Sequence, residues 1–133
     1  MGPLLIVILA AAAGSMLTLP APAPALAQDS EAGQIAFNNA CRTCHTMREG
    51  DQRLGPSLHK VIGRKAGSLA DYGNYSESMK KAELVWDKSN LDRFIASPDA
   101  VVPGNNMKPF GGIASAEERA KIVQFLETET GNK

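Results

Sequence analysis

The sequence predicts a small all-α protein in which about four to five short helices are connected by long loops. Four segments place apolar residues at helical spacing or carry helix-capping residues. After residue 27, no segment alternates apolar and polar residues for long enough to form a sheet. The connections LGPSLHK, VIGRKAG and VVPGNNMKPFGG are rich in Gly, Pro and Asn. Loops of that length need something to pack on.

The first two helices are predicted on either side of a long irregular region. One is expected over about residues 30–40, where Gly33 and Phe37 stand four residues apart on one helical face. A short one is expected over about residues 76–82. The region between them, which includes LGPSLHK and VIGRKAG, is expected to be a loop.

The last two helices have clearer boundaries. The third is expected to begin near Asp87 and to end at Pro98, because proline interrupts a helix. Its apolar face is Leu91, Phe94 and Ile95. The fourth is expected to run from Ser115 to near Gly131, since Ser115 and Glu118 have the spacing of a capping box. Its apolar face is Ile122, Phe125 and Leu126.

Residues 1–27 have the layout of a secretory signal peptide. An apolar run, LLIVILAAAA, is followed by PAPAPALA, in which Ala25 and Ala27 form a small-x-small cleavage site. No Lys or Arg precedes the apolar run. The alternative is an uncleaved anchor, but Leu4 to Leu19 is sixteen residues, and a span needs roughly twenty. We therefore predict cleavage after Ala27 and export to the periplasm.

The remaining chain, residues 28–133, is expected to form one domain. It carries all fourteen Lys+Arg and all fourteen Asp+Glu residues, so its formal net charge is zero. A nucleic-acid partner would call for a strongly basic face, which this balance argues against. Aromatic residues are 5% of the sequence, so the side chains alone build a modest apolar core.

The stretch CRTCH contains both cysteines, Cys41 and Cys44, followed by His45. A disulfide across so short a loop would remove little chain entropy and would stabilise the fold poorly. A redox-active thiol pair remains open, because Cys-x-x-Cys spacing suits thiol exchange. A zinc site is less suited, because zinc takes about four ligands and the other histidine, His59, lies fourteen residues beyond His45.

Covalent haem attachment fits CRTCH best, since Cys-x-x-Cys-His is the signature of that linkage. Each thiol can add to one vinyl group of the porphyrin, and the adjacent histidine then serves as an axial ligand of the iron. A buried porphyrin would supply the apolar bulk that the side chains lack, and the long loops would pack on it. Export agrees with this interpretation, because the haem would be attached outside the cytoplasm.

A second axial ligand has four candidates. They are His59, Met47, Met79 and Met107. Met47 is too close to His45 along the chain to reach the other face of the iron, and Met79 falls in a predicted helix where core packing is its expected role. Met107 follows a Pro-Gly turn in the loop VPGNNM and is the preferred candidate. His59, which would make a bis-histidine site, is the alternative.

With these motifs in place, the sequence resembles the class I c-type cytochromes, both mitochondrial cytochrome c and the small soluble bacterial members. The likeness covers residues 28–133. It follows, in order, Gly33 and Phe37, CRTCH, GPSLHKVIGRKAG, Tyr75-Ser76, Trp86, Pro98, VPGNNM and the last helix. The resemblance implies a cytochrome c fold wrapped around one covalently attached haem c, with Gly33 and Phe37 packed against Phe125 where two helices cross.

The resemblance also assigns roles to individual residues. It implies that Cys41 and Cys44 form the thioethers and that His45 and Met107 are the axial ligands. The carbonyl of Pro56 would accept the hydrogen bond that orients His45. The residues expected around the haem propionates are Arg64, Tyr75 and Trp86.

The sequence departs from mitochondrial members near the distal ligand. Phe94 stands where they have a tyrosine near the methionine sulfur, and Asn105 and Asn106 stand where a Thr-Lys pair is common. The resemblance therefore does not specify the hydrogen bonds around Met107.

The function implied by this resemblance is one-electron transfer, since histidine plus methionine leaves no open position on the iron for substrate chemistry. The expected protein is a monomeric carrier and not an enzyme. Its partners would be membrane or periplasmic redox proteins: a donor such as a cytochrome bc-type complex or a dehydrogenase, and an acceptor such as an oxidase, a reductase or a photosynthetic reaction centre. Two rivals are a peroxidase-like haem enzyme or sensor with a labile distal ligand, and a haem-free thiol oxidoreductase.

Overall fold

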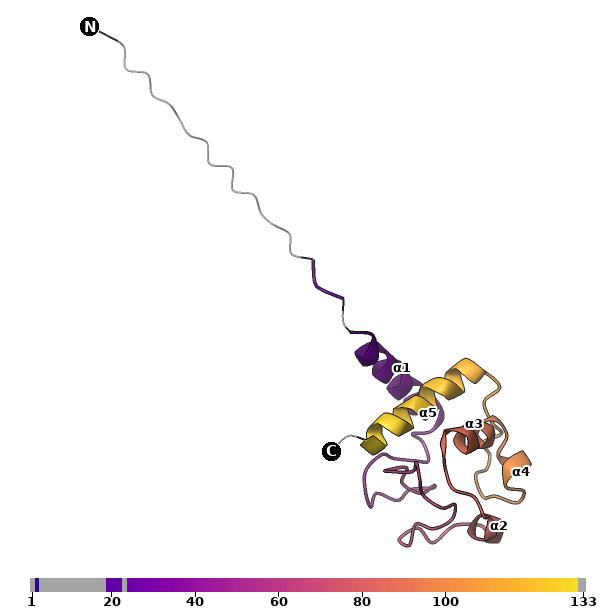
Figure 1. Ribbon diagram of the computed structural model, residues 1–133. Helices are drawn as coiled ribbons and strands as arrows, with labels where there is room; N and C mark the ends of the chain where they lie inside the picture. The colour runs from indigo at the N-terminus through magenta and orange to yellow at the C-terminus, as the bar shows by residue number, and fades with distance from the viewer. Residues whose placement is uncertain (1, 3–18, 23, 132–133) are drawn as a thin grey trace.

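The computed structural model describes residues 2, 19–22 and 24–131. In this part of the chain it contains five helices and no strand, which confirms the all-α prediction (Figure 1). The helices are α1 (Ala25–Ala40), α2 (Glu77–Lys81), α3 (Lys88–Ala96), α4 (Pro98–Val101) and α5 (Ala116–Gly131). Most of the predicted signal peptide, residues 1–27, lies outside the described residues, so its cleavage stays a prediction.

The start of α1 differs from the sequence prediction. The helix begins at Ala25, five residues before the expected Ser30. Residues 25–29 are exposed, so packing does not require them to be helical. Their sequence, ALAQD, opens with strong helix formers, which accounts for the added turn.

The crossing of α1 and α5 forms the upper part of the molecule (Figure 1). Gly33 lies at the contact, where an added Cβ would stand 2.6 Å from the carbonyl oxygen of Lys121 and 2.8 Å from the Cβ of Phe125. The rings of Phe37 and Phe125 pack with their centroids 5.3 Å apart. The packing of Gly33 and Phe37 against Phe125 is therefore confirmed.

Side-chain caps begin α3 and α5 where the sequence predicts. The Asp87 carboxylate accepts the backbone N–H of Asn90 at 2.7 Å at the start of α3. The Ser115 hydroxyl accepts the backbone N–H of Glu118 at 3.2 Å at the start of α5. Because α3 packs on α5, these caps orient two helices that carry a large part of the apolar core.

Pro98 ends α3, as expected, but it also begins the four-residue helix α4. Proline suits the first helical position because it has no N–H to satisfy there and its φ is already helical. A single turn is too short to show apolar periodicity, and sequence analysis missed it. The loop that carries Met107 follows α4 directly.

The long loop between α1 and α2 folds back on the segment before α3. Backbone hydrogen bonds join Gly63 N–H to Trp86 O at 2.7 Å and Trp86 N–H to Arg64 O at 2.9 Å. An isolated antiparallel bridge between Lys65 and Val85 continues this pairing. In Figure 1 the loops lie on the side of the molecule away from the α1–α5 crossing.

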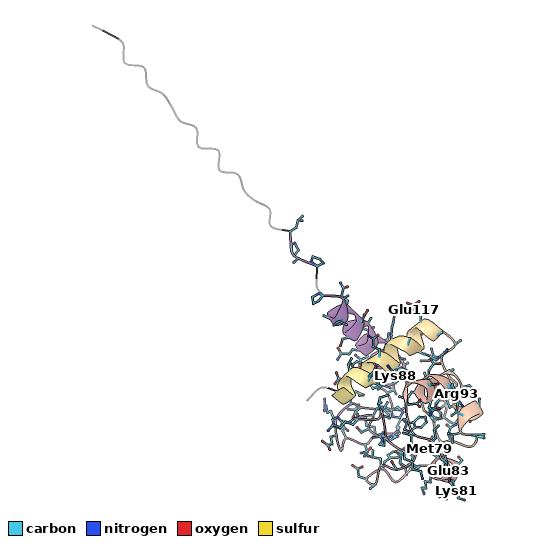
Figure 2. All side chains as sticks on the ribbon, viewed as in Figure 1. Met79, Lys81, Glu83, Lys88, Arg93 and Glu117 are labelled. Atoms are coloured by element: carbon cyan, nitrogen blue, oxygen red, sulfur yellow. The ribbon has the colours of Figure 1, made fainter. Side chains whose placement is uncertain are left out.

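The apolar core extends from the helices into the loops. Ile122 and Leu126 of α5 are 0% and 1% exposed, and Val61, from the loop, is also 1% exposed. Met79 lies within the body of the molecule, whereas Lys81 and Glu83 lie at its edge (Figure 2). Of the described helices, none has the length and apolar character needed to cross a membrane.

Candidate haem centre

The CRTCH stretch continues directly from the end of α1. The N–H of Cys41 donates to the carbonyl of Phe37 at 2.8 Å, and the N–H groups of Cys44 and His45 then donate to the carbonyl of Cys41 at 3.1 and 2.9 Å. Cys41 is buried, Cys44 is half-buried, and both are free thiols. A single helical turn therefore carries the two thiols and the imidazole.

His45 is held in a buried position by the GPSLHK segment. Its Nδ1–H donates to the carbonyl of Pro56 at 2.7 Å, as the resemblance implied, and the residue is 7% exposed. A carbonyl can only accept, so the proton is on Nδ1 and the lone pair on Nε2 is available to a metal. Gly55 lies against the ring, where an added Cβ would be 2.3 Å from Cε1.

Burial lowers the pKa of His45, the hydrogen bond to Pro56 acts in the opposite direction, and the positive charge of Arg64 lowers it further. The balance favours the neutral imidazole. Neutral imidazole is the form that binds a metal ion. The surroundings of His45 therefore suit an axial ligand.

Met107 lies in the loop between α4 and α5. Its side chain is half-buried and packs against the apolar core. Its backbone N–H donates to the side-chain oxygen of Asn105 at 2.9 Å. Asn106, which directly precedes Met107, donates its side-chain N–H to the carbonyl of Asn74 at 3.0 Å. Asn74 is the residue before Tyr75.

The other ligand candidates are less suited. Met79 is 8% exposed and belongs to the core cluster, which agrees with a packing role. The Nε2 of His59 has no hydrogen-bond partner, but it lies 3.8 Å from the carboxylate of Glu49, whose side chain is 86% exposed. His59 therefore lies beside a surface carboxylate.

The three residues predicted around the propionates lie in two adjoining segments. Arg64 and Trp86 are paired through their backbones, and the Trp86 ring packs on Phe94 with centroids 5.0 Å apart. Burial raises the pKa of Tyr75, and the positive charge of Arg64 acts against that shift. Arg64 and Tyr75 are therefore close enough to interact electrostatically.

Arg64 is a half-buried cation that hydrogen-bonds to carbonyls. Its guanidinium donates to Ser57 O at 2.9 Å and to His59 O at 3.3 Å. Burial lowers its pKa, which is the cost of holding a positive charge away from water. Across residues 24–131, no carboxylate forms an ion pair with it. An anionic group such as a propionate suits this position.

Sequence analysis missed Gly55 and Tyr72. The signal for Gly55 was its place before Pro56, where a residue without a side chain precedes a rigid one. Tyr72 donates to the carbonyl of Leu54 at 2.7 Å, and its ring packs edge-on against Tyr75 with centroids 4.8 Å apart. Tyr72 therefore contacts both the segment before Gly55 and the predicted propionate site.

The donor chemistry of these residues fits a haem and argues against a redox-active thiol pair. Burial raises the pKa of Cys41 to about 11, with the nearby Cys44 adding to the shift. Thiol oxidoreductases depend on a lowered thiol pKa. In contrast, a buried neutral imidazole, a half-buried methionine, a guanidinium with no carboxylate partner among the described residues and partly buried apolar side chains from several loops match what a haem needs.

Comparison with known proteins identifies close relatives. The model of the family described as cytochrome c oxidase, cbb3-type, subunit III matches residues 28–126. Cytochrome c of Cochliobolus lunatus is 35% identical over 103 residues, covering 77% of this chain and 94% of that protein. Cytochrome c2 of Rhodomicrobium vannielii is 38% identical over 109 residues, covering 79% and 82%. The structure of cytochrome cH from Methylobacterium extorquens superposes with a TM-score of 0.68 at 37% identity, covering 75% of this chain and 98% of that one.

Proposed function

Because this chain belongs to the class I c-type cytochromes, we propose that it is a soluble periplasmic carrier of single electrons whose iron is bound by His45 and Met107. Membership in the family implies one covalently bound haem c. We assign its two thioether links to Cys41 and Cys44. The relatives are electron-transfer cytochromes, and we propose the same role without enzymatic activity.

The observation that carries this proposal is the environment of His45. The imidazole directly follows the two thiols, is 7% exposed, and hydrogen-bonds through Nδ1 to Pro56 O at 2.7 Å. When bound, the haem supplies a one-electron ferric–ferrous couple. The hydrogen bond to Pro56 fixes the ring and raises the basicity of Nε2 as a ligand.

The remaining residues hold the two proposed ligands in place. Gly55 lets the backbone lie against the imidazole, and Asn105 fixes the backbone of Met107. A site whose protein ligands are held in both oxidation states needs little rearrangement when an electron arrives or leaves. Arg64, Tyr75 and Trp86 would surround the propionates and offset their charge.

The proposed partners are membrane or periplasmic redox proteins. The donor would be a protein such as a cytochrome bc-type complex or a dehydrogenase, and the acceptor an oxidase, a reductase or a photosynthetic reaction centre. Membership in the cytochrome c family, whose members carry electrons between redox partners, supports this class of partner.

Four measurements on the purified protein test the proposal. An intact mass one haem above the polypeptide, together with a pyridine haemochrome spectrum of a twice-linked haem, is expected for thioethers at Cys41 and Cys44. A low-spin six-coordinate absorption spectrum is expected for closed ligation. A high-spin spectrum would favour a haem enzyme or sensor with a labile ligand, and two titratable thiols in the denatured protein would favour the thiol oxidoreductase.

A further inference from the structure

We propose that Asn105 is the positioning residue that keeps Met107 on the iron, and that Asp99 of α4 supports it. The proposal rests on the proposed ligation by Met107. It concerns the region in which the sequence departs from mitochondrial members, so the resemblance does not supply it.

Both polar atoms of the Asn105 side chain are hydrogen-bonded to the segment from α4 to Met107. The residue is 4% exposed. Its Oδ1 accepts the N–H of Met107 at 2.9 Å, and its Nδ2 donates to Val102 O at 3.0 Å and to Asp99 Oδ1 at 2.9 Å. These four residues, which we call the Asn105 clamp, join α4, the turn after it and the ligand residue.

The clamp makes opening of the loop costly. Moving Met107 away from the haem side breaks the bond to Oδ1, which is the one hydrogen bond that this buried amide oxygen accepts in the described part of the chain. A buried polar group that loses its partner costs the full desolvation penalty of that group. Asn106, the adjacent residue of the same type, is exposed and makes a single side-chain hydrogen bond, to Asn74.

Asp99 supports the clamp from both sides of the ligand. While its Oδ1 accepts from Asn105, its Oδ2 pairs with the ammonium of Lys108, the residue after Met107. The side chains of Asp99 and Lys108 are 58% and 54% exposed, so their charge attraction contributes little. The structural effect of Asp99 is that one carboxylate contacts residues on both flanks of Met107.

The clamp can be measured through an external ligand. Imidazole binds the ferric protein only where Met107 has moved away, so its apparent affinity is proportional to the open fraction of the loop. Replacing Asn105→Ala removes all three side-chain bonds and is expected to raise imidazole affinity by about tenfold or more. Asn105→Ser keeps a hydroxyl that can accept the Met107 N–H, although more weakly than the amide. Its imidazole affinity is expected to fall between those of the unmodified protein and Asn105→Ala.

Two control variants separate positioning from general loosening. Asn106→Ala removes the neighbouring exposed amide and should leave imidazole affinity unchanged. Ile122→Val alters a residue of α5 that is 0% exposed and should lower the denaturant midpoint without changing imidazole affinity. If Asn105→Ala does not fold, Asp99→Ala carries the test. It removes the carboxylate that contacts Asn105 and Lys108 but leaves the bonds of Asn105 to Met107 and Val102 in place, and it should still raise imidazole affinity.

The outcomes are distinguishable. The unmodified ferric protein should show the weak red band of methionine-ligated haem, and its absence would refute both the ligation and the clamp. If the band is present and Asn105→Ala behaves like Asn106→Ala, the clamp is wrong and the ligation stands. An equal rise in imidazole affinity for Ile122→Val would show that overall stability, and not Asn105, controls the loop.

Discussion

At the scale of single residues, the surroundings of His45 are specified by contacts that are distant in sequence. Pro56 supplies the acceptor for Nδ1, eleven residues away, and Gly55 supplies the space against the ring. The motif CRTCH predicts a ligand, but it contains no information on which residues will hold that ligand. The sequence marks Gly55 only by its place before Pro56, and its contact with the His45 ring is found from the structure.

Gly55→Ala tests this packing. Its Cβ would stand 2.3 Å from Cε1 of His45, so either the ring or the loop must move. Overpacking of a filled site costs about 1–3 kcal/mol, and we expect a loss of stability of that size in the holoprotein, measured by denaturant unfolding. Gly73→Ala is the matched control, because nothing lies within 4 Å of its Cβ. Equal stability of the two variants would show that the His45 site tolerates displacement.

Met107→Leu tests the distal ligand. Leucine keeps the apolar bulk and lacks the sulfur, so the red band should disappear and the reduction potential should fall by about 0.1 V or more, within the range that axial ligands set. Met79→Leu makes the same change at a residue that is 8% exposed and packed in the core, and it should preserve both properties. Loss of the band in Met79→Leu alone would reassign the ligand.

At the scale of elements, the structure confirms the helices that carry an apolar face or a cap. α3 and α5 begin after Asp87 and Ser115 because those side chains satisfy exposed N–H groups at the helix starts. α4 was missed because one turn has no periodicity. The extra turn of α1 was missed because residues 25–27 belong to the predicted leader, and residues 25–29 are exposed and have no apolar face toward the core.

At the crossing of α1 and α5, packing decides whether Gly33→Ala stabilises or destabilises the protein. Helix propensity alone would make Gly33→Ala stabilising by about 1 kcal/mol. However, its Cβ would be 2.6 Å from a backbone oxygen of Lys121, and a carbonyl in a helix cannot move away as a flexible side chain can. We expect a net destabilisation of about 1–3 kcal/mol in denaturant unfolding.

Gln34→Ala, on the exposed side of the same helix, is the control for this prediction and should be neutral or slightly stabilising. If Gly33→Ala unfolds at a higher denaturant concentration than the unmodified protein, the two helices do not pack as closely as the structure indicates.

At the scale of the whole molecule, charge is distributed in a way that weakens long-range steering. Residues 42–108 contain eleven Lys+Arg and eight Asp+Glu, an excess of +3, while the segments before and after carry −2 and −1. Several cations of this middle segment already have carboxylate partners: Arg53 with Asp51, Lys80 with Glu77, Lys88 with Glu127 and Lys108 with Asp99. Such pairs reduce the field that a partner protein would encounter.

Apolar contact is expected to take a larger share in docking. Leu54 is 75% exposed, and it precedes Gly55, whose N–H donates to the carbonyl of Cys44 at 2.8 Å. An exposed leucine therefore lies next to the segment that carries the proposed thioether. We expect Leu54 to provide an apolar contact for a partner that approaches the haem from this side.

Weak electrostatic steering is measurable without knowing the physiological partner. The ferrous protein can be oxidised by ferricyanide, an anion, and by tris(phenanthroline)cobalt(III), a cation, across a range of salt. Steering raises association rates strongly only where one sign of charge dominates a face, and its reach shrinks from about 30 Å at 0.01 M salt to about 8 Å at 0.15 M. We therefore expect each rate to change by less than about tenfold over that range.

Glu77→Gln, which leaves Lys80 without its carboxylate, should make the rate of oxidation by ferricyanide fall more steeply as salt rises. A drop of several decades for ferricyanide in the unmodified protein would reveal a concentrated basic face, and docking would then be governed by charge.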